Sequence, residues 1–131
     1  MNKHLGKVKI GIMSWVDFQK YTMAIVKGEY KRKPDEPKIW FNSIKSLANA
    51  LSEENQKLLR LIIQESPQSI SELEPLTGRK ANNLLRTLRM MEGYGFVELN
   101  KSKIKSSGRT ALIPTVLYDT ADIEIHFGAA Y

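Results

Sequence analysis

The N-terminal segment carries the pattern of a strand followed by a helix. Apolar residues alternate with polar residues or glycine over residues 8–12, which predicts a short, half-buried strand. Ser14, with Asp17 three positions later, is typical of a helix N-terminus, and apolar residues continue at helical spacing to about Lys27. We therefore expect a strand and a helix here, followed by a polar loop over residues 28–38.

A second short unit precedes the centre of the chain. Residues 38–41 read Lys-Ile-Trp-Phe and are predicted to be extended. Ser43 is placed to cap a helix whose apolar residues recur three and four positions apart. We interpret residues 1–51 as an N-terminal strand and helix extension that is a possible dimerisation arm.

Two helices are predicted directly after this extension. Ser52 precedes a run with one broad apolar face at helical spacing, and Pro67 is expected to stop that helix. Ser69 and Glu72 have the spacing of a capping box, which predicts the start of a second, shorter helix. Pro75 lies late in this second helix and is expected to distort or end it.

A third helix is predicted over residues 79–92, after a turn at Thr77 and Gly78. Gly93 and Gly95 are expected to terminate it. Its aliphatic residues gather on one side of a helical wheel, so that side is expected to bury against the two preceding helices.

The C-terminal part of the chain has extended patterns. A strand is predicted over residues 96–99, and a polar loop over 100–108 connects it to a returning strand over 110–118. Pro114 indicates that the returning strand lies at an edge or carries a bulge. Residues 122–127 alternate apolar and polar side chains and are predicted to form a last strand.

The order of these elements predicts the fold class. Helix, short helix, turn, amphipathic helix and β-hairpin follow one another in the order of a winged helix-turn-helix. We expect an α+β protein with a three-helix core, a β-hairpin wing and an N-terminal strand–helix extension. Residues 52–131 are interpreted as the winged helix-turn-helix domain.

Composition narrows the class of function. The chain has 131 residues, a net charge of +6 and no cysteine. The lack of cysteine excludes a disulfide scaffold, a thiol nucleophile and cysteine-based metal sites. No stretch is long and apolar enough to suggest a membrane span, and we expect a cytoplasmic protein with access to DNA.

The positive charge is concentrated in one part of the chain. Residues 77–109 hold eight basic and two acidic residues, whereas the remainder of the chain is neutral. Basic residues gathered on a helix and the hairpin after it are typical of a nucleic-acid-binding surface. The alternative interpretation is a solvated basic surface without a ligand.

Within this region, the polar side of the third helix is the candidate DNA-reading surface. Arginine can form two hydrogen bonds to guanine, and asparagine can do the same to adenine, in the major groove. The candidate base-contacting residues are Arg79, Asn82, Asn83 and Arg86. For the two asparagines, the alternative is a solvated polar pair.

Residues at the flanks of that side and in the hairpin are the candidate phosphate contacts. Alternate residues of a strand share one face, so three lysines at alternate positions are placed to follow a DNA backbone or enter a minor groove. The candidate backbone-contacting residues are Lys80, Thr87, Arg89, Lys101, Lys103, Lys105 and Arg109. Lysines on an edge hairpin can instead serve to prevent edge-to-edge aggregation.

Residues 69–99, with the sequence SISELEPLTGRKANNLLRTLRMMEGYGFVEL, resemble the MarR-like winged-helix regulators. The positions that match the structural pattern of that family are Leu73, Gly78, Leu84, Leu88, Gly95 and Val97. The N-terminal part is similar to small predicted regulators related to MarR, some of which are antitoxins of the TumA type. Tyr94 and the lysine-rich wing depart from the usual pattern. The resemblance implies a DNA-binding regulator and, for the TumA-type subgroup, an antitoxin that represses its own operon and neutralises a toxin.

Three functional hypotheses follow. The first is a sequence-specific transcriptional regulator, a repressor, that binds double-stranded DNA as a homodimer on two half-sites. The second is an antitoxin or interaction module whose main partner is a protein toxin. The third is a small ribonuclease. The candidate dimer surfaces are the N-terminal strand and helix or, alternatively, the C-terminal strand. The candidate apolar anchors, for which core burial is the alternative, are Trp15, Phe18, Trp40 and Phe41.

An enzyme is the least favoured of these classes. The chain has two histidines, His4 and His126, and neither has a metal-ligand partner at a recognised spacing. His126 is interpreted as a strand surface residue. We predict no catalytic residue, no metal and no cofactor.

Overall fold

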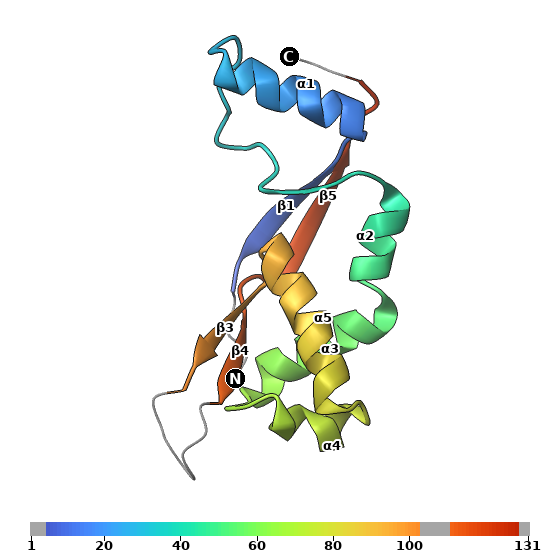
Figure 1. Ribbon diagram of the computed structural model, residues 1–131, viewed down its shortest axis with the longest axis vertical. Helices are drawn as coiled ribbons and strands as arrows, with labels where there is room; N and C mark the ends of the chain where they lie inside the picture. Colours follow the sequence, from blue (N-terminus) through green and yellow to red (C-terminus); the bar gives the residue numbers. More distant parts are fainter. Residues whose placement is uncertain (1–4, 103–110, 129–131) are drawn as a thin grey trace. The chain divides into compact units, whose positions relative to one another are not determined.

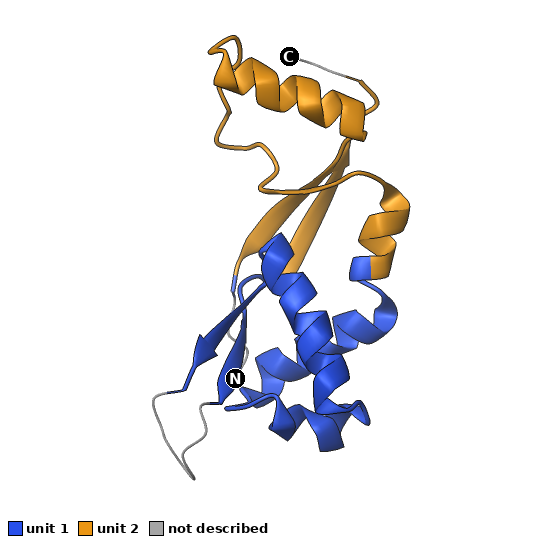
Figure 2. Cartoon of the chain, viewed as in Figure 1, with its two compact units in different colours: residues 1–5, 50–119 blue, residues 6–49, 120–131 orange. Residues whose placement is uncertain are grey.

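The computed structural model describes residues 5–102 and 111–128. It is an α+β structure that divides into two compact units (Figure 2). Unit 1 consists of residues 1–5 and 50–119, and unit 2 consists of residues 6–49 and 120–131. Residues 120–131, which the sequence pattern assigns to the domain over 52–131, therefore belong to unit 2. The reason is that the last strand pairs with the first strand of the chain.

Unit 2 is built on a three-stranded parallel sheet with the strand order β2-β1-β5. Figure 1 labels two of these strands, β1 and β5. The strands are β1 (Lys7–Ile12), β2 (Ile39–Phe41) and β5 (Thr120–Ile125). In the central strand, Ile10 is aligned with Ile39 on one side and with Ile123 on the other. All three predicted strands of this unit are confirmed, although β5 starts and ends two residues earlier than expected.

Helix α1 (Trp15–Val26) provides the crossover between the parallel strands β1 and β2. Ser14 caps it as expected, because the Ser14 hydroxyl accepts a hydrogen bond of 3.2 Å from the Asp17 amide. Helix α2 (Ile44–Ala50) follows β2, and the hydroxyl of Ser43 accepts from the Ser46 amide at 3.0 Å. Both predicted N-terminal caps are therefore confirmed.

Gly11 allows close packing at the centre of this sheet. A Cβ atom at this position would lie 2.5 Å from a ring carbon of Trp40 and 2.8 Å from Cγ of Pro37. The Trp40 ring in turn packs against Phe18, with ring centroids 6.0 Å apart, and against Tyr21, with centroids 5.5 Å apart. Contacts among these rings attach α1 to one face of the sheet.

Unit 1 contains helix α3 (Glu53–Glu65), a 3-10 turn η1 (Ser71–Leu73), and helices α4 (Glu74–Thr77) and α5 (Ala81–Tyr94). A two-stranded antiparallel sheet follows, formed by β3 (Val97–Lys101) and β4 (Leu112–Val116). The larger buried hydrophobic side chains of this unit lie in α3, η1, α5, β3 and β4, with Phe96 directly before β3. They are Leu58, Ile62, Leu73, Leu84, Leu88, Met91, Phe96, Val97 and Val116.

The second predicted helix is wrong in its form. The Ser69 hydroxyl does accept the Glu72 amide at 3.3 Å, but the chain then forms a 3-10 turn and a separate α-helical turn. Pro75 lies in the first turn of α4, where its missing N–H and fixed φ are tolerated, rather than near a helix end. Gly78, with φ 72°, ends α4 in the left-handed conformation that favours glycine.

The third predicted helix is confirmed, with shifted ends. It begins at Ala81 rather than at Arg79, and it continues through Gly93 to Tyr94. Gly95 alone ends it, with φ 97°. The two extra C-terminal residues extend the helix to the point where Phe96 and Val97 enter the core.

Candidate nucleic-acid interface

The start of α5 is fixed by a cap from outside the helix. Lys80 precedes the helix in an extended conformation, and its side chain forms no capping hydrogen bond. A carboxylate oxygen of Glu74 instead accepts a hydrogen bond of 2.8 Å from the Ala81 amide. A negative charge at a helix N-terminus also interacts favourably with the helix dipole. Glu74 thereby joins α4 to α5 and determines the residue at which α5 begins.

The side of α5 opposite its core contacts exposes Asn82, Asn83 and Arg86. The side chains of Asn82 and Arg86 make no hydrogen bond or ion pair with any residue that the structure describes. Asn82 and Arg86 therefore present one neutral and one cationic donor group to solvent, about one helical turn apart. Their donor and acceptor geometry suits the edges of bases in a major groove.

Arg79 lies before α5 and extends along it. Its guanidinium donates to Asn83 Oδ1 at 2.7 Å, to Thr87 Oγ1 at 2.6 Å and to Asn55 Oδ1 of α3 at 3.3 Å. The Arg79 residue is half-buried. Because three acceptors already hold it, Arg79 connects α3 to the side of α5.

This network separates the four residues predicted to contact bases. The structure brings Asn82, Asn83 and Arg86 together on one exposed side of α5, whereas Arg79 lies at its border and is bonded within the protein. The Asn83 side chain accepts from Arg79, which fixes the orientation of its amide. Thr87, predicted as a backbone contact, is half-buried and its hydroxyl accepts from Arg79.

The C-terminal half of α5 is tied to the β3–β4 sheet. Arg89 donates to Glu92 Oε1 at 3.1 Å, in an ion pair whose arginine side chain is 54 % exposed. The other carboxylate oxygen of Glu92 accepts the Leu99 amide of β3 at 3.4 Å. Glu92 therefore links Arg89 to β3, and the negative charge of Glu92 is compensated by the Arg89 guanidinium.

The remaining predicted cations flank this side. Lys80 is exposed at the start of α5, and Lys101 is exposed at the end of β3, opposite Leu112 of β4. Lys103, Lys105 and Arg109 lie outside the described residues.

Two residues that position this surface are absent from the sequence predictions. Asn55 supports Arg79 from α3, and Asn55 also donates to the Ala50 carbonyl at 3.0 Å. Glu74 caps α5 from seven residues upstream. An acidic residue near a predicted helix start was a usable signal for Glu74. No sequence pattern links Asn55 to Arg79, because 24 positions separate them.

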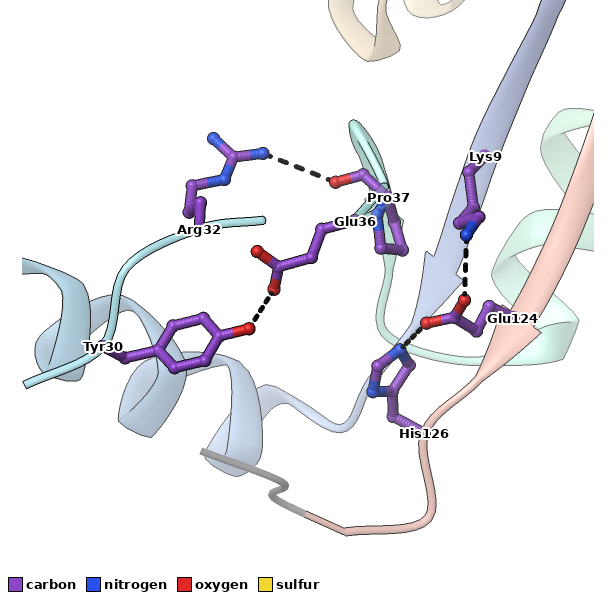
Figure 3. A network of polar contacts seen from close by, with 7 residues as sticks. All are labelled: Lys9, Tyr30, Arg32, Glu36, Pro37, Glu124 and His126. Atoms are coloured by element: carbon purple, nitrogen blue, oxygen red, sulfur yellow. Dashed lines mark hydrogen bonds and ion pairs between the residues drawn. The ribbon is translucent and has the colours of Figure 1, made fainter. Parts of the chain in front are cut away.

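A second polar network lies in unit 2 (Figure 3). The Tyr30 hydroxyl donates to Glu36 at 2.8 Å, and this hydrogen bond raises the pKa of Tyr30 to about 12. Burial favours the protonated form of Glu36, but hydrogen bonds from Tyr30 and from the Lys33 amide outweigh it and lower the Glu36 pKa. Arg32 donates to the Pro37 carbonyl at 3.4 Å. These contacts fold the polar loop of residues 28–38 onto itself.

A third group of polar contacts surrounds Glu124 at the edge of the unit 2 sheet (Figure 3). The Glu124 carboxylate lies 3.5 Å from Lys9 Nζ and 2.7 Å from His126 Nε2. The His126 ring also packs edge-on against Trp40, with centroids 5.3 Å apart. His126, expected on the strand surface, is thus half-buried just after β5.

Neither network has the composition of a metal site. Among the residues that the structure describes, no three His, Asp or Glu side chains cluster in a way that would hold a metal ion. Among the described residues of unit 1, one cleft lies between α3 and β4 and includes Ile62 and Pro114. Another lies between α3 and α4 and includes Leu61 and Leu76. No helix in the described segments is sufficiently long and apolar to cross a bilayer.

Comparison with known proteins gives one family. The family model described as HVO_A0114 matches residues 50–123, which include all of the helices and strands of unit 1. No curated protein and no solved structure has a significant match to the chain.

Proposed function

We propose that this chain, which belongs to the HVO_A0114 family, is a sequence-specific DNA-binding transcriptional regulator. In this proposal, residues 50–119 form a winged helix-turn-helix, with α4 and α5 as the helix pair and β3–β4 as the wing. The observation that carries the proposal is the exposed side of α5, where Asn82 and Arg86 face solvent. The two acidic residues nearby are already engaged, because Glu74 caps α5 and Glu92 pairs with Arg89.

The proposed roles follow from the contacts of each residue. Asn82, Asn83 and Arg86 read base edges in a major groove, because they are exposed and carry the appropriate donors. Arg79 orients Asn83 and supports α5 rather than reading a base itself, since it is bonded to α3. We propose that such binding represses transcription by blocking access to a promoter.

The phosphate contacts are assigned to the basic residues around the exposed side of α5. Lys80 lies at the N-terminal end of α5, Arg89 lies beside the sheet, and Lys101 leads into the segment with the remaining basic residues. Neutralising several phosphates releases condensed counterions, and the affinity is then expected to fall steeply as salt rises. The exposed Arg89–Glu92 ion pair costs little to open when Arg89 binds a phosphate.

The test begins by selecting preferred sites from a pool of random DNA duplexes with the full chain. Affinity for the selected duplex is then measured by fluorescence anisotropy over a range of salt concentrations. We expect a selected motif, and Arg86→Ala should weaken binding to that motif by about 1–3 kcal/mol. The proposal is wrong if no motif is enriched and the chain binds selected and random duplexes alike.

A further inference from the structure

The outer edge of β5 is open and unusually apolar. In the described part of the chain, β5 pairs only with β1, so its other edge has no strand beside it. Ile123 is 56 % exposed, Ile125 is 44 % exposed, and Phe127, just beyond the strand, is 96 % exposed. An exposed apolar strand at a sheet edge is a ready site for pairing with another strand.

The direction of the peptide groups shows which residues that pairing would use. The His126 amide donates to the Ile12 carbonyl of β1 at 2.8 Å. Since successive residues of a strand direct their N–H and C=O groups to opposite sides, Ile123 and Ile125 direct theirs to the open edge. The residues with free backbone groups are therefore also the residues with exposed apolar side chains.

The apolar face of the sheet is continuous across this edge. By the strand register, Ile123 and Ile125 lie on the same face as Ile10 and Ile12 of β1, which are 0 % and 5 % exposed. The opposite face carries Asp122, which lies 3.5 Å from Lys7. A strand added to β5 would extend the buried apolar face of the sheet. On the opposite face, it would meet polar side chains.

We propose that the strand added here is β5 of a second copy, in antiparallel pairing centred on Ile125. In this register Ile125 faces Ile125 of the second copy, Ile123 faces Phe127, and Glu124 faces His126. The apolar side chains of Ile123, Ile125 and Phe127 then meet apolar ones, and each Glu124 carboxylate meets an imidazole.

The charges of β5 disfavour the two registers that are shifted toward the start of the strand. Centring the pairing on Glu124 places two Glu124 carboxylates opposite each other, and centring it on Ile123 places Asp122 opposite Glu124. Like charges directly opposite each other on a sheet are unfavourable. This complementarity of the strand with itself is the reason for assigning a second copy, rather than an unrelated peptide, to the edge.

The purpose of this dimer rests on the proposed function, because regulators of this type bind two half-sites with two copies. The experiment keeps the two apart by measuring self-association without DNA. Sedimentation of the full chain over a range of concentrations should give a dimer. Ile125→Lys, which places two lysines at the centre of the pairing, should raise the dimer dissociation constant by about 100-fold.

The matched control is Ile44→Lys on α2, because Ile44 is 57 % exposed and the substitution is the same. It should leave the dimer unchanged. A monomeric wild type, or equal weakening by both substitutions, would overturn the inference. Circular dichroism and thermal unfolding of Ile125→Lys establish that its monomer is folded, and Ile123→Lys provides an independent variant of the same edge.

The register itself can be measured, since the chain has no cysteine. A short bismaleimide should join Ile125→Cys to the same residue of the second copy, because facing residues lie about 5.5 Å apart between Cα atoms. It should not join Ile123→Cys, because the two positions would be four residues apart along the strand, or about 14 Å. Cross-linking through Ile123→Cys but not Ile125→Cys contradicts the proposed register.

Discussion

Replacing Arg79 with alanine tests whether this residue supports α5 or simply faces solvent. The substitution removes three hydrogen bonds, of 2.6, 2.7 and 3.3 Å, from a half-buried side chain. A typical hydrogen bond contributes about 0.5–1.5 kcal/mol net, and the longest of the three and the partial exposure reduce the total. We expect Arg79→Ala to lower the free energy of unfolding by about 1–2 kcal/mol.

The matched control is Arg86→Ala, which removes the same charge and side chain from the exposed side of α5. Because Arg86 has no described partner, its substitution should change the free energy of unfolding by less than about 0.5 kcal/mol. Urea unfolding followed by circular dichroism, with both variants in the same buffer, measures the difference. Equal stability of the two variants would refute the assignment of Arg79 to a supporting role.

A double-mutant cycle locates the support more closely. Asn55 accepts from Arg79 across the space between α3 and α5, so Asn55→Ala and Arg79→Ala should not be additive. We expect a coupling of about 0.5 kcal/mol or more in unfolding free energy. Additive effects would show that the hydrogen bond between the two helices contributes nothing to stability.

Three other substitutions have defined outcomes. Glu74→Ala should lower unfolding free energy by about 0.5–2 kcal/mol in urea titrations, because α5 loses its N-terminal cap; an unchanged value would contradict that role. Gly11→Ala should destabilise the fold by about 1–3 kcal/mol through the clash with Trp40, and a neutral thermal melt would contradict it. The Tyr30 pKa is raised on folding from 10.0 to about 12, so its contact with Glu36 stabilises the protein below pH 10 and is lost as pH rises to about 12. Unfolding midpoints of wild type and Tyr30→Phe should therefore converge over that range, and a constant difference would exclude the effect.

The local elements were predictable because each has a local cause. Alternation in β1, the capping serines of α1 and α3, and the aliphatic stripe of α5 are all encoded within a few residues. The exposed side of α5 follows from the same stripe, because burying the aliphatic residues turns Asn82 and Arg86 outward.

The long-range contacts were not predictable in this way. The pairing of β5 with β1 joins the two ends of the chain, and the alternation in β5 does not specify its neighbour. The Arg79 network is of the same kind, since a helical wheel that starts at Arg79 assumes the residue is helical. Once the helix begins at Ala81, the Arg79 side chain is free to extend along α5 and to contact α3.

The most direct test of the account is the sequence preference of Arg86→Ala compared with Lys101→Ala on the duplex selected by the wild-type chain. We predict that Arg86→Ala loses about 1–3 kcal/mol on the selected site and relaxes the preference at one base pair, because it removes a base contact. Lys101→Ala should weaken selected and random duplexes equally and reduce the salt dependence by about one counterion. If Arg86→Ala weakens all duplexes equally, or leaves the selected site unaffected, the exposed side of α5 is not the surface that reads DNA.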